Sequence, residues 1–407
     1  MRGPMLERRH LLAGIGATAL FGGAFVPRVA SAGNGDPRFL TVILRGALDG
    51  LSAVPPIGDP SYAAARGRLA MATSGEHAVL PGDGFFAFNP KLPRLAEMFR
   101  RGEALVIQAV ATPYRDRSHF DGQEVLETGL ERPGGRDGWL NRAIAAMPQG
   151  PRVASGPRGL ALMPTVPLVI RGTAPVMSWA PQFTYSADVD TVRRILAVYE
   201  SRDHALATAL RAGAQLDTEA NAQPMRGGAT GGAGAAQRFA ELARFAAERL
   251  ARPDGPRVAV LNVDGWDTHA MQGPVTGRLG QLLDLLDQGI EALRTGLGPA
   301  WRESSVLLAT EFGRTVRING TDGTDHGTAT IALLVGGAVK GGRVVADWPG
   351  LGENRLYQSR DLMPTTDLRA VIKGVLNAQF DMPERVLNEQ VFPGSANIRP
   401  LRDLVRA

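Results

Sequence analysis

Apolar residues along the chain gather in short runs that are separated by longer amphipathic stretches. This alternation is typical of α/β proteins, in which buried strands alternate with helices that cover the sheet. Between two of the runs, the apolar residues from Leu279 to Leu293 fall on one face of a predicted crossover helix. We therefore predict an α/β fold with a mostly parallel central sheet and helices on both faces. The predicted strands are residues 39–44, 104–110, 160–163, 168–170, 258–263, 306–310 and 331–335.

One region interrupts this alternation. Residues 217–236 are rich in glycine and alanine and read as a flexible loop between two helical stretches, at about 189–216 and 238–250. These helices would form a cap over the sheet or an oligomer contact. We therefore predict a single domain over 33–407 with a helical and Gly-rich insertion at about 189–250.

The first 32 residues have the features of an export signal. An arginine pair at 8–9 precedes an apolar stretch over 11–26, and Ala-Ser-Ala at 30–32 offers a cleavage site. This order resembles a bacterial twin-arginine signal. The apolar stretch is shorter than the roughly 20 residues that a membrane-spanning helix needs, and an uncleaved anchor is the alternative. We expect cleavage after Ala32, export in folded form by the twin-arginine translocase, and a periplasmic or extracellular protein without a stable membrane span.

Composition and charge exclude several classes of protein. The 407 residues include 45 basic and 40 acidic ones, which gives a formal net charge of +5, and four arginines and one glutamate in the first 32 residues account for +3 of it. No basic run is interleaved with aromatic residues, so we do not expect a nucleic-acid partner. The absence of cysteine excludes disulfides, iron–sulfur clusters, thiolate zinc and a cysteine nucleophile. Any metal must be held by oxygen and imidazole nitrogen.

Polar residues follow several predicted strands at the points where the strands end. The carboxyl ends of parallel strands meet at one edge of a sheet, where ligands bind. Three of the six histidines, His119, His269 and His326, lie in these polar segments within two residues of an aspartate. We therefore expect a functional site at this edge. The segments are residues 45–50, 111–121, 264–269 and 311–327.

Imidazole and carboxylate groups together suit a divalent metal. The set favours zinc, manganese or iron, with calcium or magnesium if carboxylates dominate. The alternative interpretation is structural, because these residue types also cap helices and fix turns, as Ser118 and Asp121 would at the start of a helix. Three clusters at successive strand ends favour a site.

Five motifs in these segments, placed behind a twin-arginine signal, resemble the bacterial domain-of-unknown-function family 1501. The match runs from about residue 39 to the C-terminus. The resemblance implies an alkaline-phosphatase-like fold, in the superfamily that includes the sulfatases and phosphopentomutase, and it implies the activity less directly than the fold. The motifs are Arg45-Gly-x-x-Asp49-Gly, Ser118-His119-Phe120-Asp121, Asp264-Gly-Trp-Asp267-Thr-His269, Glu311-Phe-Gly-Arg314-Thr and Gly323-Thr-Asp-His326-Gly.

The superfamily pattern places two metal ions beside a hydroxyl or formylglycine nucleophile at a helix N-terminus. The metals lower the pKa of the nucleophile and neutralise charge on the transferred group, and helix amides hold its oxygens. Carried to this chain, the resemblance implies that Asp49 is the metal aspartate of the first strand. Either Asp264 or Asp267 would act with His269, and His326 would bind the same ion. The implied metal ligands are Asp49, Asp264, Asp267, His269, Glu311, Asp325 and His326.

The chain also departs from that pattern. Where relatives carry Asp-His directly after a strand, it has Glu311-Phe312, so phenylalanine stands at a ligand position. An alternative alignment makes Asp325-His326 that pair, but no histidine follows it. A ligand is missing in both alignments, so the second metal would be weakened or absent and the site would hold as few as one ion.

The nucleophile departs as well. Residues 111–115 have the shape of the sulfatase Cys/Ser-x-Pro-x-Arg motif, but the first of them is alanine, which cannot become formylglycine. Thr112 and Ser118 remain as hydroxyl candidates, and Ser118 is favoured by its place at a helix start beside His119. A conventional formylglycine sulfatase is not expected.

Two functions from different classes are consistent with these residues. The first is an exported metal-dependent hydrolase of phosphate, sulfate or related anionic esters, acting on a small ester or a cell-envelope component. Its catalytic residues would be Ser118, Thr112, His119 and Arg314, where Arg314 and Arg117 either clamp an anionic group or pair with carboxylates. The second is a non-catalytic exported binding or assembly protein that keeps the fold. An oxidoreductase is a third possibility, but the chain lacks a Gly-x-Gly-x-x-Gly loop.

Overall fold

The computed structural model describes residues 36–148, 157–180, 189–211 and 232–406. Residues 36–407 form one compact unit. The predicted export signal, and residues 217–231 of the predicted Gly/Ala loop, lie outside the described residues. Within the described ranges, none of the helices combines the length and the apolar character that crossing a membrane would take.

The core of this unit is one large sheet with the strand order β10-β4-β9-β8-β1-β7-β5-β6, and β11 pairs with β4 beyond that path. All its strand pairs are parallel except those of β9, which runs antiparallel to β4 and β8. The predicted mostly parallel α/β sheet is therefore confirmed. The strands are β1 (Arg38–Arg45), β4 (Ala104–Ala111), β5 (Gly159–Ala161), β6 (Val176–Ser178), β7 (Val258–Asp264), β8 (Ser304–Ala309), β9 (Thr330–Val335), β10 (Arg343–Val345) and β11 (Thr366–Asp367).

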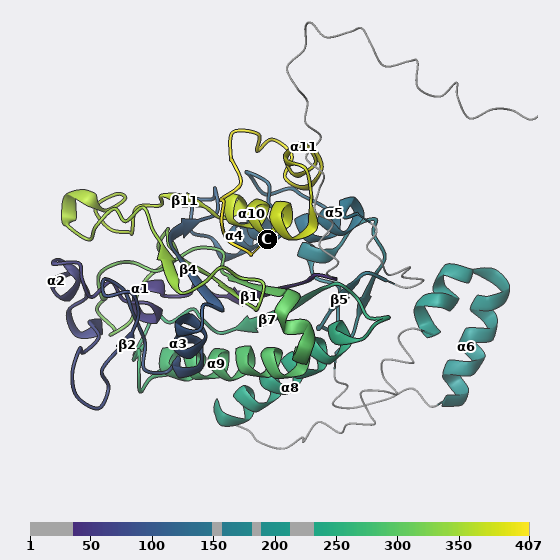
Figure 1. The fold of residues 1–407 in the computed structure, drawn as a ribbon, viewed down its shortest axis with the longest axis horizontal. Helices are drawn as coiled ribbons and strands as arrows, with labels where there is room; N and C mark the ends of the chain where they lie inside the picture. The colour runs from purple at the N-terminus through teal and green to yellow at the C-terminus, as the bar shows by residue number, and fades with distance from the viewer. Residues whose placement is uncertain (1–35, 149–156, 181–188, 212–231, 407) are drawn as a thin grey trace, which may run out of the picture. The chain divides into compact units, whose positions relative to one another are not determined.

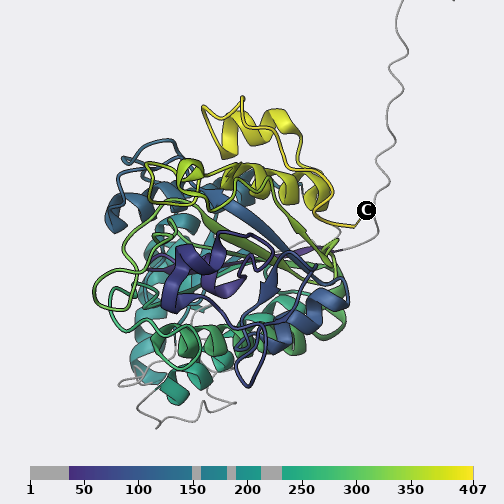
Figure 2. The ribbon, with the colours of Figure 1, turned by 90° about the vertical axis from the view of Figure 1, so that its left-hand side faces the viewer.

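Helices cover both faces of the sheet because side chains of the central strands alternate between two apolar cores. In β1, Leu40 and Val42 belong to one core, and Phe39 and Ile43 belong to the other. Figures 1 and 2 show α3, α8 and α9 on one side of the sheet and α4, α5 and α10 on the other. The helices are α1 (Gly50–Ala53), α2 (Tyr62–Arg66), α3 (Pro93–Arg100), α4 (His119–Thr128), α5 (Trp139–Ala146), α6 (Val189–Arg202), α8 (Gly232–Ala251), α9 (Arg278–Leu297), α10 (Leu368–Phe380) and α11 (Glu384–Val386).

Short elements complete the unit, and several were not predicted. Strands β6, β10 and β11 and the separate antiparallel hairpin of β2 and β3 are two or three residues long, too short to give a periodic pattern. The short elements are β2 (Leu80–Pro81), β3 (Ala87–Phe88), the 3₁₀ turns η1 (Gly67–Leu69), η2 (Leu168–Ile170), η3 (Gly298–Glu303) and η4 (Glu353–Arg355), and the π-helical η5 (Leu387–Val391).

One predicted strand is wrong. Residues 168–170 form the 3₁₀ turn η2, not a strand. Val169 and Ile170 are buried in the same core as α4 and α5, and this burial explains the apolar run that suggested a strand. An apolar run of three residues carries no period that would separate the two conformations.

The helix that follows the Gly/Ala region belongs to the body of the domain. α8 begins at Gly232, within the segment predicted as loop, and Ala243, Ala246 and Leu250 on it are fully buried against the α9 side of the sheet. α9 itself is the predicted crossover helix. The small residues of α8 allow close packing of the two helices. α8 therefore forms part of the layer that covers the sheet.

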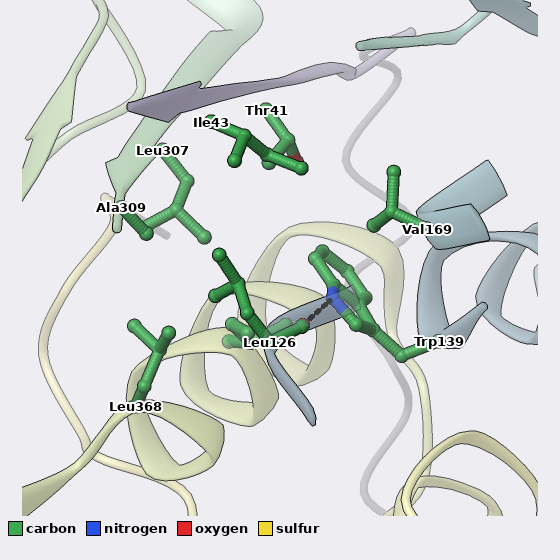
Figure 3. A pocket seen from close by; sticks show the side chains of 9 residues that line it. Thr41, Ile43, Leu126, Trp139, Val169, Leu307, Ala309 and Leu368 are labelled. Atoms are coloured by element: carbon green, nitrogen blue, oxygen red, sulfur yellow. Dashed lines mark hydrogen bonds between the residues drawn. The ribbon is translucent and has the colours of Figure 1, made fainter. Parts of the chain in front are cut away.

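A small cavity lies under the sheet on the α10 side (Figure 3). Its volume is about 10 Å³, and its walls are almost entirely apolar. Trp139 closes one side, where its Nε1 donates to the Leu126 carbonyl at 3.1 Å. A water needs a space of roughly this size and at least two polar partners. Thr41 supplies the one side-chain hydroxyl of the lining, which suits a dry packing defect better than a ligand site.

Candidate metal centre

Three histidines from distant segments meet at the carboxyl ends of β7 and β8. His119 is the first residue of α4, His269 lies in the loop after β7, and His326 lies in the long loop between β8 and β9. The Nε2 atom of His326 lies 2.9 Å from Nε2 of His119 and 3.0 Å from Nε2 of His269. The prediction that the strand-end histidines gather at one edge agrees with this arrangement.

The other ring nitrogen of each histidine points away from the cluster to an oxygen acceptor. Nδ1 of His119 lies 2.8 Å from Oε1 of Glu311, and Nδ1 of His269 lies 3.2 Å from Oδ1 of Asp325. Nδ1 of His326 lies 2.9 Å from the carbonyl oxygen of Arg117. Carbonyl and carboxylate oxygens only accept, so we assign the hydrogen of each neutral ring to Nδ1. The Nε2 lone pairs of His119 and His269 then both face Nε2 of His326.

Asp267 closes the cluster with negative charge. Its Oδ1 lies 2.9 Å from Nε2 of His269 and 3.2 Å from Nε2 of His326, and its Oδ2 lies 3.5 Å from Nε2 of His119. Arg314, which is fully buried, donates to Asp267 from one terminal nitrogen at 2.5 Å. Lone pairs and a carboxylate this close together repel unless a proton or a metal cation lies between them.

The donor set fits a divalent metal. His119, Asp267 and His326 each offer one atom, and these atoms all lie within 4.8 Å of one another. Histidine ligands of metals commonly donate their second nitrogen to a carboxylate or carbonyl, which fixes the ring. The contacts of His119 and His326 have this form. His269 lies outside that group of three but touches two of its members.

The charges around the cluster favour a neutral His326 and an ionised Asp267. Burial lowers the pKa of His326. Burial alone would raise the pKa of Asp267, but the hydrogen bond and the charge of Arg314 bring it below its usual value. The hydrogen bond to Glu311 raises the pKa of His119. Both directions favour the forms of Asp267 and His326 that bind metals.

Two backbone features bring these side chains together. Gly46, just after β1, has a φ of +113°, and a Cβ there would lie 2.6 Å from the backbone nitrogen of Asp267, so only glycine allows this approach. The Gly46 N–H donates to Glu311 at 2.8 Å. Arg117 has a left-handed backbone with φ of +61°, and its carbonyl is the partner of His326.

Phe312 stands at the position that the resemblance assigned to a metal ligand, and it packs on the histidine cluster. Phe312 is buried and stacks on the His119 ring, with centroids 4.9 Å apart and an interplanar angle of 28°. It also lies 5.3 Å from the ring of His326. Its apolar ring thus packs directly against two of the three histidines.

The predicted ligands Asp49 and Asp264 lie apart from the cluster in their contacts. Asp49 is buried and forms an ion pair with Arg66, and it also accepts from Gln272 at 2.6 Å. Asp264 is exposed at the end of β7. Glu311 and Asp325, also predicted as ligands, contact Nδ1 atoms of the histidines rather than their Nε2 atoms.

The predicted catalytic residues differ in accessibility. Thr112 is buried, and its hydroxyl donates to the carbonyl of Glu311 at 3.2 Å. Ser118 is the N-cap residue of α4, as predicted, but its hydroxyl makes no capping hydrogen bond. Arg117 forms an ion pair with Asp361 at 2.7 Å. Arg117 and Arg314 thus both pair with carboxylates, one of the two alternatives left open by the sequence.

Residues that carried no motif also shape the site. The side-chain nitrogen of Asn319 donates to Oδ1 of Asp325 at 3.1 Å and to the carbonyl of His269 at 2.9 Å. Gln272 accepts from Thr324, whose hydroxyl in turn accepts from Arg314 at 3.1 Å. Gln272 follows one histidine motif and Asn319 precedes another within a few residues. This closeness in sequence is the signal that could have identified them.

Comparison with known proteins gives a family. The family model described as "Protein of unknown function (DUF1501)" matches residues 49–391. A search of curated proteins found no match. What the chain can do chemically therefore has to be read from its own residues.

Several solved structures are similar in part. The structure of Ps i-CgsB in complex with k-i-k-neocarrahexaose has a TM-score of 0.43 and 8% identity, with 90% of this chain and 77% of that chain covered. The phosphonate monoester hydrolase of Agrobacterium radiobacter has a TM-score of 0.35 and 12% identity, with 84% and 73% covered. The zinc complex of the C-terminal periplasmic domain of EcEptC from Escherichia coli has a TM-score of 0.28 and 12% identity, with 75% and 74% covered.

Proposed function

Because the chain belongs to the DUF1501 family, for which no function is given, we propose one from its own site: an exported metal-dependent hydrolase of phosphate, sulfate or related anionic esters. The observation that carries the proposal is the convergence of imidazole Nε2 atoms and the Asp267 carboxylate, with each ring held from behind through Nδ1. A purely structural histidine cluster gains nothing from lone pairs directed at one another.

The donor set also supports a choice of metal. His119, Asp267 and His326 supply two nitrogens and a carboxylate, which suits zinc or manganese better than calcium or magnesium. Phe312 occupies the neighbouring space with an apolar ring. We therefore propose that the centre holds a single ion.

The chemistry follows from charge and proton transfer. A bound divalent ion would neutralise negative charge on the ester oxygens. Hydrolysis forms one bond from the attacking oxygen to phosphorus or sulfur and breaks the bond to the alcohol oxygen. His269, oriented through Nδ1 by Asp325, would take a proton at Nε2 from the attacking hydroxyl and pass it to the leaving oxygen.

The attacking hydroxyl belongs to water or to Ser118. Attack by Ser118 would form a phosphoserine or sulfoserine, and a water molecule would then break that bond to release the anion and restore the serine. Ser118 is partly exposed, and its hydroxyl is not used to cap α4. The Thr112 hydroxyl is buried and already donates to a carbonyl, so it is the weaker candidate. A Ser118→Ala variant that keeps full activity would assign the attack to water.

Metal content tests the proposal most directly. We expect protein purified without chelator to carry about one equivalent of zinc or manganese, and His326→Ala to carry less than about a tenth. His77→Ala is the matched control, because His77 is an exposed histidine outside the cluster, and it should keep the metal. Equal metal content in both variants, or none in the wild type, would exclude this centre.

Activity separates the proposal from its alternative. We expect the metal-loaded protein to hydrolyse members of a panel of aryl phosphate monoesters, phosphate diesters and sulfates, and His269→Ala to keep the metal but lose at least about a hundredfold in rate. The buried Phe312 favours the alternative, a non-catalytic binding or assembly protein with one metal. That alternative predicts bound metal and no hydrolysis anywhere on the panel.

Export is a further part of the proposal. The arginine pair, the apolar stretch and the Ala-Ser-Ala site in the first 32 residues support export by the twin-arginine translocase to the periplasm or beyond. N-terminal sequencing of the exported protein should begin at residue 33. A retained N-terminus would favour an uncleaved membrane anchor.

A further inference from the structure

Two large apolar side chains stand out by their exposure. Phe120 is 90% exposed and Met271 is 79% exposed, whereas the next such residue within the described ranges, Val198, is 56% exposed. Phe120 follows His119 directly, and Met271 comes two residues after His269. The two most exposed large apolar residues of the described chain are therefore close neighbours in sequence of two histidines of the cluster.

The backbone presents both side chains from fixed positions. Phe120 is the second residue of α4, which is anchored by its buried residues Val125 and Leu126. Met271 has a left-handed backbone with φ of +42°, which long side chains rarely adopt. Its N–H donates to the Thr321 carbonyl at 2.8 Å. A strained backbone persists only where its surroundings enforce it, and such residues gather at functional sites.

The loop that carries Met271 is tied to the metal centre itself. The hydroxyl of Thr321 donates to the carbonyl of His269 at 2.7 Å, and the N–H of Gln272 donates to the carbonyl of Asp322 at 2.8 Å. Gly323 passes so close that a Cβ there would lie 2.2 Å from the His269 carbonyl oxygen. These contacts fix the position of the Met271 backbone relative to His269.

The size of this feature points to a small occupant. A stable protein interface takes about 20–30 residues from each partner, and two side chains fall far short of that. Small-molecule sites combine apolar contacts with a few polar groups that fix orientation. Here the polar groups are those of the histidine cluster, and the apolar contacts are Phe120 and Met271.

We propose that Phe120 and Met271 bind the alkyl or aryl group of an amphiphilic ester whose anionic group lies at the histidine cluster. This inference rests on the proposed function, because it takes the anionic group to bind there. It adds that the substrate has an apolar portion directly next to that group. A wholly polar ester, such as a small sugar phosphate, would leave both side chains in water.

The test compares alkylphosphonates, whose C–P bond resists hydrolysis, by calorimetric binding to the zinc-loaded full chain. Burial of one methylene strengthens binding by about fourfold, so octylphosphonate should bind at least about tenfold more tightly than methylphosphonate. The double variant Phe120→Ser and Met271→Asn should lose this preference and keep its affinity for methylphosphonate. Asparagine is chosen because it tolerates a left-handed backbone. Val198→Ser, an exposed change outside the site, should keep the preference.

Each other outcome has a distinct meaning. Equal affinity for methyl- and octylphosphonate in the wild type overturns this inference and leaves the proposed function standing. Failure to bind any phosphonate, with zinc present, overturns both. Equal binding of neutral octyl glucoside, or sedimentation with anionic phospholipid vesicles, overturns the inference in favour of a lipid surface. Because both substitutions are at exposed positions, unchanged thermal unfolding verifies that the variants fold.

Discussion

Two carboxylates follow strands of the same sheet, and they have opposite surroundings. Asp49, after β1, is 2% exposed and meets the guanidinium of Arg66, the hydroxyl of Ser52 and the amide of Gln272. The side chain of Asp267, after β7, is 40% exposed and faces imidazole nitrogens on one side. From the sequence both were predicted to bind metal.

Each carboxylate has one arginine partner, so the difference lies in the groups that face its other side. Around Asp49 every neighbour is a donor, so the carboxylate is satisfied by residues of the chain. Around Asp267 one neighbour, Arg314, is a donor, while the Nε2 atoms of His269 and His326 bring lone pairs. We therefore expect a strand-end carboxylate to bind a metal only where donors of the chain do not already surround it.

A continuous hydrogen-bonded path joins the two regions. Gln272 donates to Asp49 at 2.6 Å, and its oxygen accepts from the Thr324 hydroxyl at 2.7 Å. Thr324 accepts from Arg314, which donates to Asp267. Since Asp49 can only accept, the orientation of each later group in the path is determined. The hydrogen bonds around Asp49 therefore help to orient Arg314 toward Asp267.

The largest effect is expected around Asp49. Arg66→Met would leave the Asp49 carboxylate buried without its charged partner, at a cost of about 3–5 kcal/mol in the free energy of unfolding. If Asp49 were a metal ligand, removal of the neighbouring cation would strengthen metal binding, and added zinc would restore the loss. We expect urea unfolding to show the same loss with and without zinc.

The control for this prediction lies two residues away. The guanidinium of Arg68 is 77% exposed and pairs with the exposed Asp322, so Arg68→Met should change the free energy of unfolding by less than about 0.5 kcal/mol. If Arg66→Met does not fold, Arg66→Lys keeps a charge and should show a smaller loss. A loss under about 1 kcal/mol for Arg66→Met would contradict the comparison.

A smaller effect is expected where the two regions join. Gln272→Leu removes the amide that links Asp49 to Thr324, so Thr324 and Arg314 lose part of what orients them toward Asp267. Substitution of such supporting residues commonly weakens metal binding by 10- to 100-fold. We expect about a tenfold loss of zinc affinity, or about 1.4 kcal/mol, measured by competition with a chelating dye.

Gln108→Leu is the matched control for that change. Gln108 is an equally buried amide on β4 that donates to the Val54 carbonyl at 3.0 Å, and among the described residues it makes no hydrogen bond to Arg314 or Asp267. It should lower stability without changing zinc affinity. Equal zinc affinities in the two variants would break the proposed link between the networks.

The sequence predicts the parts of this picture that depend on periodicity and position. Runs of buried residues located the long strands, and the histidines after β4, β7 and β8 were correctly expected at one edge. His119, predicted as catalytic, falls within the ligand group, and His269, predicted as a ligand, falls beside it. Which of these two histidines belongs to the group depends on differences of a few ångströms, and the spacing of residues along the chain does not encode such differences.

Other features depend on contacts between segments that carry no motif. Arg66 lies in α2, outside every motif, yet it determines that Asp49 is satisfied within the protein. The carbonyl of Arg117 reaches His326 because the backbone of Arg117 is left-handed. This conformation cannot be predicted from the sequence, since the residue is not a glycine. β9 likewise departs from the predicted alternation, because it follows β8 with no helix between them and pairs with it antiparallel.

The smallest effect is expected at a third kind of buried polar group, one that has no partner. Thr41 on β1 is buried beside the cavity in Figure 3, and its hydroxyl has no hydrogen bond within the part of the chain that the structure describes. Thr41→Val keeps the branched shape and removes this unpaired group, so the free energy of unfolding should rise by about 1 kcal/mol. Thr330→Val is the matched control, because the Thr330 hydroxyl donates to the Leu48 carbonyl at 2.8 Å. In this variant the free energy of unfolding should fall by about 1 kcal/mol. A loss in both variants would mean that Thr41 has a water partner in solution, and the cavity would then belong with the satisfied networks. A gain at Thr41 alone would set it apart from both carboxylates, since donors of the chain satisfy Asp49, the proposed metal ion would complete the surroundings of Asp267, and Thr41 has neither.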